Sequence, residues 1–140
     1  MSADTVRALL TRFIESNHED LSVLAEDMVY TNMATGEEHR GREAARAMLQ
    51  YIYHGAFDAH AELRTLLCDA EHAVLEATFV GRHIGDFAGV PATGKKVHVP
   101  LCVVYDIADD RIKRARIYFE LPAFLAQVRG AESAAAAVMQ

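Results

Sequence analysis

A few side chains that could perform acid/base chemistry or donate hydrogen bonds fall inside apolar segments of this sequence. His83 ends one such segment and Tyr105 lies within another. An imidazole can act as a general base near neutral pH, and a tyrosine hydroxyl can stabilise a developing oxyanion. Tyr30 and Asn32, in the short segment MVYTNM, could contact the same ligand. Each residue also has a structural interpretation, since His83 could bond to the following loop and the tyrosine rings could fill a core.

Two other groups of polar residues predict no site. His54, Asp58 and His60 are close in sequence, but they span the end of an expected helix and the start of an expected strand. They therefore share no face, and we predict no metal site. The segment GVPATGK lacks the glycine and lysine spacing of a phosphate-binding loop. No cofactor is expected.

Composition limits the class of protein. The chain has 140 residues, of which 51% are hydrophobic and 24% charged, as in one ordinary globular domain. A net charge of −6 argues against nucleic acid as a partner. No signal-peptide pattern and no membrane-length apolar run occur, and two cysteines do not suggest a disulfide framework. We expect a cytoplasmic protein without membrane contact, with a single domain over residues 1–130 and an Ala-rich tail over 131–140.

The hydrophobic periodicity changes along the chain from helical to strand-like. Apolar residues at helical spacing predict a helix over 4–16, a helical turn over 20–26 and a helix beginning at Gly41. A strand over 28–33 and a short return strand separate the last two. Alternating residues then predict strands over 59–68, 72–83, 95–107 and 111–120, followed by a closing helix. Helices followed by consecutive strands indicate an α+β fold.

Alternation assigns the strand residues to two faces. In the last three long strands the odd positions are apolar, so they share the face that the helices must cover. Phe79, Val103, Ile117 and Phe119 would then form the wall of a pocket if the interior is hollow, or core if it is filled. The opposite face mixes charges with apolar residues such as Tyr118. This face suits either contact with a second subunit or exposure to solvent.

The stretch GRHIGDFAGVPATGKKVHVP, residues 81–100, carries a resemblance to a known family. It is similar to the loop signature G-x-H-x-G-x-F-x-G-x-P-x-T-G-(K/R) of the SnoaL-like polyketide cyclases (ester cyclases), a branch of the nuclear-transport-factor-2-like superfamily. The resemblance implies a cone-shaped curved antiparallel sheet covered by N-terminal helices, a cystatin-like α+β fold. It also implies a homodimer, a largely apolar interior, and intramolecular aldol chemistry that needs neither metal nor cofactor.

The sequence departs from that family at one position. Active members place an aspartate on the final strand, where this chain has Ile117. Parity points Ile117 and Val103 inward and Glu120 outward. No Arg-x-Asp pair, as used by the related limonene-epoxide hydrolases, occurs in the chain.

Three hypotheses follow. The first is a cyclase-type enzyme acting on a hydrophobic, carbonyl-bearing small molecule by cofactor-free acid/base chemistry, with His83 as the catalytic residue. The second is a non-catalytic dimer that binds such a molecule, and the third is a dimeric scaffold with a filled core. The dimer would form through the outer face of the sheet. The predicted ligand pocket comprises Tyr30, Asn32, Phe79, Val103, Tyr105, Ile117 and Phe119.

Overall fold

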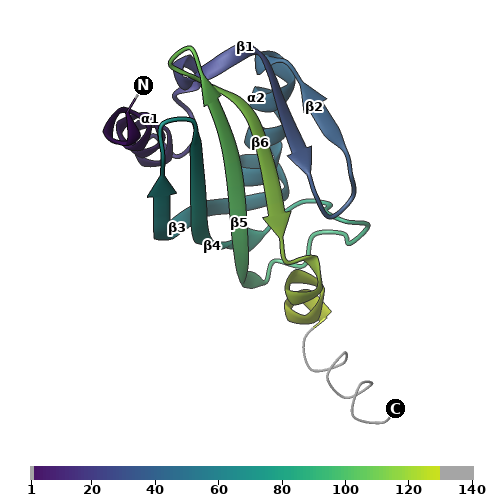
Figure 1. Ribbon diagram of the computed structural model, residues 1–140. Helices are drawn as coiled ribbons and strands as arrows, with labels where there is room; N and C mark the ends of the chain where they lie inside the picture. Colours follow the sequence, from purple (N-terminus) through teal and green to yellow (C-terminus); the bar gives the residue numbers. More distant parts are fainter. Residues whose placement is uncertain (1, 130–140) are drawn as a thin grey trace.

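One curved six-stranded sheet organises the protein (Figure 1). The computed structural model describes residues 2–129, so the tail predicted at 131–140 lies outside the described residues. The elements are α1 (Ala3–Glu15), a 3₁₀ turn η1 (Leu21–Val23), β1 (Leu24–Asn32), β2 (Glu38–Arg40), α2 (Arg42–Gln50), a π-helical turn η2 (Tyr51–Ala56), β3 (Phe57–Cys68), β4 (His72–His83), β5 (Lys96–Ala108) and β6 (Arg111–Phe119). A closing helix follows over residues 121–129. The α+β prediction is confirmed.

The strand order in the sheet is β2-β1-β6-β5-β4-β3. The pairings from β3 to β6 and the β1–β2 pairing are antiparallel, as predicted. The β1–β6 pairing is parallel, so the sheet is mixed rather than wholly antiparallel. Parallel neighbours need a long connection, and here the chain between β1 and β6 passes through α2 and four other strands.

The N-terminal part of β1 corrects one expected boundary. A helical turn was expected over 20–26, but only Leu21–Val23 form a 3₁₀ turn, and β1 already begins at Leu24. Leu24 is fully buried and pairs with Ile112 of β6. Tertiary pairing therefore extends the strand where the short local pattern favoured a helix.

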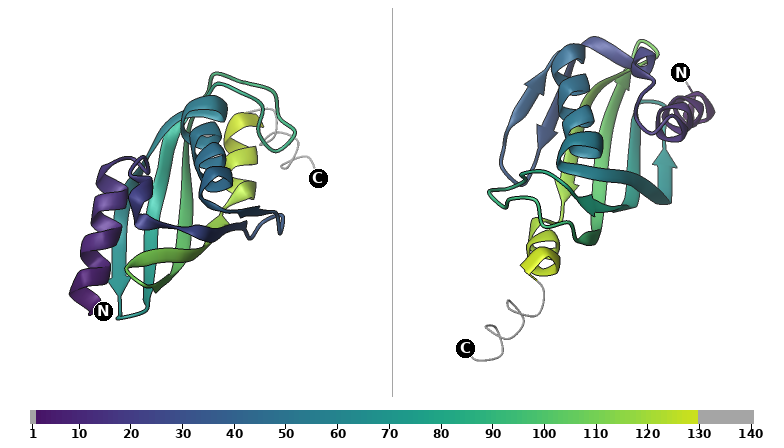
Figure 2. Two further views of the ribbon diagram at one scale, coloured as in Figure 1. Left: turned by 90° about the horizontal axis from the view of Figure 1, so that it is seen from above. Right: turned by 180° about the vertical axis from the view of Figure 1, so that it is seen from behind.

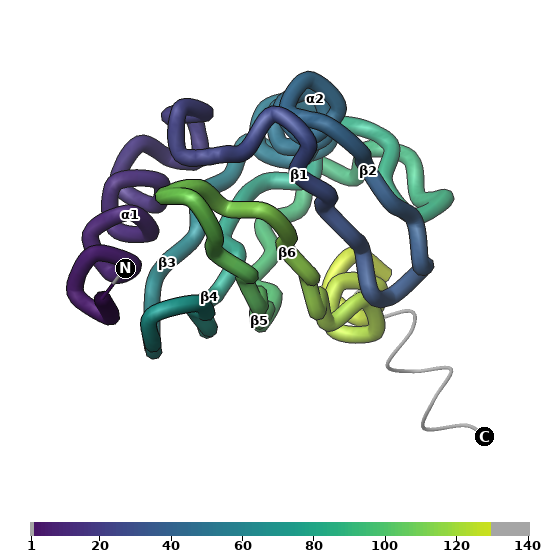
Figure 3. The backbone as a smooth tube through the Cα atoms, turned by 45° about the horizontal axis from the view of Figure 1, so that its top comes forward, coloured from purple at the N-terminus to yellow at the C-terminus, as the bar shows by residue number. Residues whose placement is uncertain are grey.

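The sheet curves around α2, which lies across its concave face (Figure 2, right; Figure 3). Register shifts interrupt β3 between Leu63 and Thr65 and the β5–β6 pair next to Asp106. Such irregularities increase twist and bend a strand. At the other end of the sheet α1 lies beside β3, where Arg7 donates a hydrogen bond to the Leu66 carbonyl at 2.8 Å. The curvature leaves space between the sheet and α2.

The predicted parity holds along the strands. Leu75, Phe79, Val103 and Tyr105 are each at most 4% exposed, whereas Glu76 and Tyr118 on the other face are exposed. Val103 and Ile117 are opposite each other in the β5–β6 ladder, so their side chains share the concave face. The shift beside Asp106 lies beyond this pair, so it does not change which way Ile117 points.

Candidate functional site

A cavity of about 650 Å³ lies between the concave face of the sheet, α2 and η2. A pocket of this size is within the usual range for small-molecule sites. The structure places all seven residues of the predicted ligand pocket around it: Tyr30, Asn32, Phe79, Val103, Tyr105, Ile117 and Phe119. The interior of the cone is therefore hollow at this position.

The walls of the cavity are mainly aliphatic and aromatic. Phe79 packs edge-on against Phe57 and Phe119, with ring centroids 4.9 and 5.7 Å away. Ile117 is half-buried beside Val103, and both line the cavity. Glu120 is exposed and does not line it. The place where the family resemblance implies an acid thus carries a hydrocarbon side chain.

Three tyrosines supply polar groups to this apolar cavity. Tyr30, Tyr53 and Tyr105 come from β1, η2 and β5, and all three line it. The Tyr105 hydroxyl is fully buried and makes no hydrogen bond of standard geometry among the described residues, although the Tyr30 phenol lies close enough to lower the pKa of Tyr105 against the effect of burial. Burial raises the pKa of each of the three phenols, and Tyr105 further raises the pKa of Tyr30. They are therefore neutral phenols that can donate hydrogen bonds.

The π-helical turn η2 brings consecutive side chains to the cavity. Tyr51, Ile52 and Tyr53 all line it. The hydroxyl of Tyr51 donates a hydrogen bond to the backbone carbonyl of Asp86, in the loop that follows β4. This bond joins η2 to the signature loop, whose residue Phe87 also lines the cavity. The loop recognised in the sequence thus helps to form the pocket wall.

His18 is a cavity residue that the sequence did not reveal. It follows α1 at a positive φ of 63° and stacks on Tyr53, with ring centroids 4.9 Å apart. Burial lowers the pKa of His18 to about 4, and its Nδ1 atom has no hydrogen-bond partner in the part of the chain described. The imidazole is therefore neutral at physiological pH. No periodic pattern covers this residue, because it lies in a turn.

His83 does not line the cavity. Its ring is fully buried between Phe57 and Phe124, with centroids 5.3 and 5.2 Å away. The Nδ1 atom accepts a hydrogen bond from the backbone N–H of Thr93 at 3.3 Å and lies 3.0 Å from the Thr93 hydroxyl. These contacts support the structural interpretation, in which His83 holds the signature loop. The catalytic role of His83 stays a prediction.

The rim of the cavity contains two further residues that the sequence analysis missed. Glu37 and His39 line the cavity from the β1–β2 hairpin. The His39 Nε2 atom lies 3.5 Å from Glu37 Oε1. Asn32 also lines the rim and uses its Oδ1 atom to accept a hydrogen bond from Ala34 N–H at 2.9 Å. If the register of the β1–β2 hairpin had been known, the inward position of Tyr30 would have indicated that Glu37 and His39 also face the cavity.

The cluster His54, Asp58 and His60 is not a site in the structure. His54 pairs with Glu19 at 3.4 Å, and His60 pairs with Glu62 at 3.5 Å. Within residues 2–129 no group of three or more histidine, cysteine, aspartate or glutamate side chains could hold a metal ion. Over the same residues, no helix is long and apolar enough to cross a membrane.

A known protein family and several solved structures are similar to this chain. The family model of the SnoaL-like polyketide cyclases matches residues 5–128. A SnoaL-like protein from Jannaschia sp. CCS1 superposes with a TM-score of 0.80 at 18% identity, covering 91% of this chain and 92% of that one. TsrD from Streptomyces laurentii has a TM-score of 0.78 at 25% identity, with 91% and 97% covered.

A third structure, from Catenulispora acidiphila, has a ketosteroid-isomerase-like fold and is in complex with trimethylamine. Its TM-score is 0.71 at 18% identity, and 86% of this chain and 91% of that chain are covered. A search of curated proteins gives no match. The family model spans most of the sequence, and the solved neighbours share the fold. The chain therefore belongs to the SnoaL-like polyketide cyclase family.

Proposed function

We propose that this protein binds a hydrophobic, carbonyl-bearing small molecule in its cavity and performs cofactor-free acid/base chemistry of the aldol type on it. The observation that carries the proposal is an apolar cavity lined by three protonated phenols, of which Tyr105 is fully buried, lies beside the Tyr30 phenol and makes no hydrogen bond of standard geometry among the described residues. A buried donor without a partner is costly, and a ligand acceptor would satisfy it. A carbonyl oxygen is such an acceptor.

The surroundings of Tyr105 favour a neutral ketone over an anionic ligand. No arginine or lysine lines the cavity in the described structure, so a carboxylate or phosphate would lack a counter-charge. The raised pKa values of Tyr30, Tyr53 and Tyr105 keep these phenols protonated. A neutral ketone would be held by a phenol hydrogen bond, and an enolate formed from it would be stabilised by the same donor.

Tyr105→Phe tests this assignment with a pair of matched ligands. The bicyclic ketone 2-tetralone carries the carbonyl, whereas tetralin has the same hydrocarbon frame without it. We expect the substitution to weaken 2-tetralone binding about 3- to 10-fold, which is the range for one neutral hydrogen bond. Tetralin binding should stay within twofold. Calorimetric titration measures both, and an equal loss for the two ligands would show that the phenol acts through packing alone.

A second candidate function is a non-catalytic binder of the same ligand. It is favoured by Ile117 and Val103, which occupy opposed inward positions and carry no proton-transferring group. Binding of 2-tetralone without any exchange of its protons would favour this alternative. The acid/base proposal requires that the bound ketone lose a proton next to the carbonyl.

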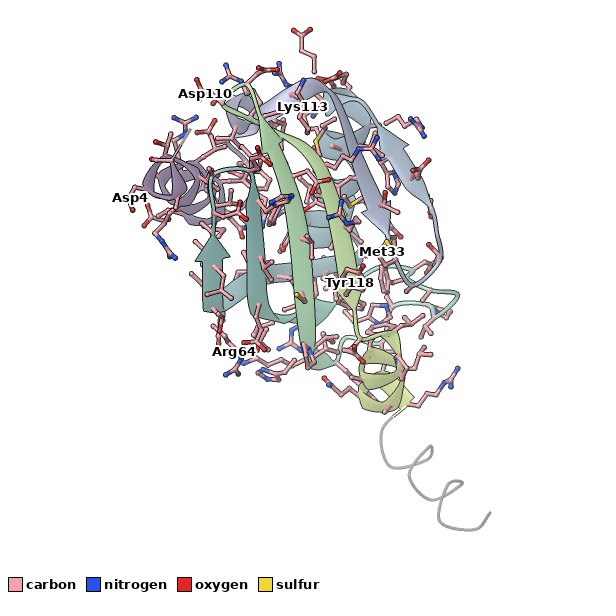
Figure 4. The ribbon with its side chains drawn as sticks, viewed as in Figure 1. Asp4, Met33, Arg64, Asp110, Lys113 and Tyr118 are labelled. Carbon is pink, nitrogen blue, oxygen red and sulfur yellow. The ribbon has the colours of Figure 1, made fainter. Side chains whose placement is uncertain are left out.

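We also propose that two copies associate through the outer face of the sheet. Tyr118 on β6 is 44% exposed on this face (Figure 4), next to the half-buried Cys102 with which it pairs across the ladder. A large aromatic on an otherwise mixed face suits an isologous dimer.

Light scattering at micromolar concentration tests this assembly. The expected mass is that of a dimer, and Tyr118→Asp should shift the population toward monomer by placing a charge in each half of the interface. The matched control is Ile84→Asp, an exposed apolar residue in the loop that follows β4 and outside the sheet. A monomeric wild-type protein would contradict the proposal.

The proposed chemistry also fits the cytoplasmic location expected from the sequence. Cys68 and Cys102 are both free thiols. Free thiols are the usual state in a reducing compartment. Proton transfer between a side chain and a carbon acid requires no oxidant, reductant or metal.

A further inference from the structure

The β1–β2 hairpin aims a second set of polar groups at the cavity. Tyr30 is opposite His39 in the antiparallel ladder, and Tyr30 is 2% exposed on the concave face. Directly opposed residues project from the same face of a sheet, so His39 points to the cavity side as well. The Asn32 N–H donates a hydrogen bond to the Glu37 carbonyl at 2.9 Å, which places these two residues opposite each other one step further on. All four side chains line the cavity.

Glu37 and His39 form a carboxylate–imidazole pair at the rim. The His39 Nε2 atom is 3.5 Å from Glu37 Oε1, and the two side chains are 26% and 65% exposed. A carboxylate beside one ring nitrogen favours the tautomer with hydrogen on that nitrogen and leaves the other nitrogen as a base. The half-buried imidazole faces the ligand space and also reaches water, so it can exchange a proton with solvent after each reaction.

We propose that His39, oriented by Glu37, is the catalytic base of this cavity, in place of the acid that Ile117 has replaced. The inference rests on the proposed function, because it requires a ketone bound inside. The C–H bond next to the carbonyl breaks, its proton passes to the His39 Nδ1 atom, and the electron pair moves onto the carbonyl oxygen as an enolate. Phenol donors in the cavity stabilise that oxygen. The proton returns from His39 to carbon, or to the alkoxide oxygen formed when the enolate carbon attacks a second carbonyl.

A second histidine–glutamate pair provides a matched control. His60 and Glu62 have the same two-residue spacing and the same 3.5 Å distance between Nε2 and Oε1. Both side chains are 58% exposed, and neither lines the cavity. Ala61, between them on β3, does line it, so alternation turns His60 and Glu62 to the outer face. What distinguishes the rim pair is its position at the ligand space.

Exchange of the activated protons of 2-tetralone in D₂O, followed by proton NMR, measures the proposed step. We expect wild-type protein to accelerate the exchange and His39→Gln to reduce the protein-dependent rate about 100-fold, as is usual for loss of a general base. The dissociation constant of 2-tetralone should stay within twofold. His60→Gln should change neither quantity.

Two further variants separate chemistry from structure. His39→Ala should recover exchange when imidazole is added, because the free base can occupy the vacated space; a merely structural histidine would not be replaced in this way. Glu37→Gln should lower the exchange rate at saturating 2-tetralone with little change in the concentration for half-saturation, as expected for a positioning residue. Glu62→Gln is its control.

The outcomes distinguish a failure of the proposed ketone binding from a failure of the proposed role of His39. Absence of 2-tetralone binding to the wild-type protein would overturn the proposed function. Binding without exchange, or exchange that persists in His39→Gln, would leave the binding proposal in place and overturn the role of His39. Loss of exchange in His39→Ala without rescue by imidazole, at unchanged ketone affinity, would likewise count against it.

Discussion

Between pH 7 and pH 4, the unfolding free energy of the wild-type protein is expected to decrease by about 3 kcal/mol more than that of the His18→Asn variant. Burial lowers the pKa of His18 from 6.5 to about 4 in the folded protein. Between these two values the unfolded chain binds a proton that the folded protein does not. Stability contributed by the neutral imidazole is therefore complete above pH 6.5 and is lost as the pH falls toward 4.

Asparagine is the replacement that removes the titratable imidazole with the least disturbance of the backbone. His18 has a φ of 63°, and asparagine tolerates this conformation better than most residues while carrying no titratable group. Urea unfolding at several pH values measures the free energy of each protein. Other acidic and basic groups titrate in both proteins, so their contributions cancel in the difference. Parallel pH profiles of the two proteins would show that His18 does not resist protonation.

Ile117→Asp, made in a His39→Gln background, is expected to raise the exchange rate of 2-tetralone about 100-fold over that background. The substitution places a carboxylate on the concave face opposite Val103, where the family resemblance implies an acid. The background removes the proposed rim base, so any gain belongs to the new group. Proton NMR in D₂O measures the rate.

The same substitution should cost about 1–3 kcal/mol of stability, because a half-buried hydrocarbon is replaced by a carboxylate. Tyr118→Asp is the matched control, since it introduces the same group one residue along β6 on the outer face. It should give no gain in exchange. An equal gain from both variants would mean that the carboxylate acts from outside the cavity, and no gain from Ile117→Asp would mean that a ketone does not lie beside β6.

Together these experiments assign the polar groups of one apolar cavity to different tasks. Tyr105 is proposed to hold the carbonyl oxygen, His39 to take the proton, and His18 to remain neutral beside Tyr53. Ile117 supplies no acid to the wall of the cavity that β6 forms. Because 2-tetralone has exchangeable C–H bonds on both sides of its carbonyl, one of them can face His39 at the rim while the other faces position 117.

Much of the fold could be read from the sequence because side chains alternate between the two faces along most of β4, β5 and β6, away from the register shift beside Asp106. The inward positions of Phe79, Val103 and Ile117 follow from a period of two along β4, β5 and β6, and the burial of these residues bears it out. The loop at residues 81–100 indicated the family through its resemblance to a known signature, and the family model confirms that prediction. Local pattern failed where the element was short, as at Leu21–Val23, because pairing with β6 outweighed propensity.

The sequence by itself determined the face of each long strand, the apolar character of the interior and the absence of an acid at Ile117, because these depend on neighbours along one strand. Only the tertiary structure decided that the interior is hollow, that His18 enters it from a turn, that Glu37 and His39 reach its rim, and that His83 packs between Phe57 and Phe124 instead. Those outcomes depend on hairpin register, sheet curvature and the distance of α2 from the sheet. Such quantities arise from contacts between residues far apart in the chain, which no local spacing encodes.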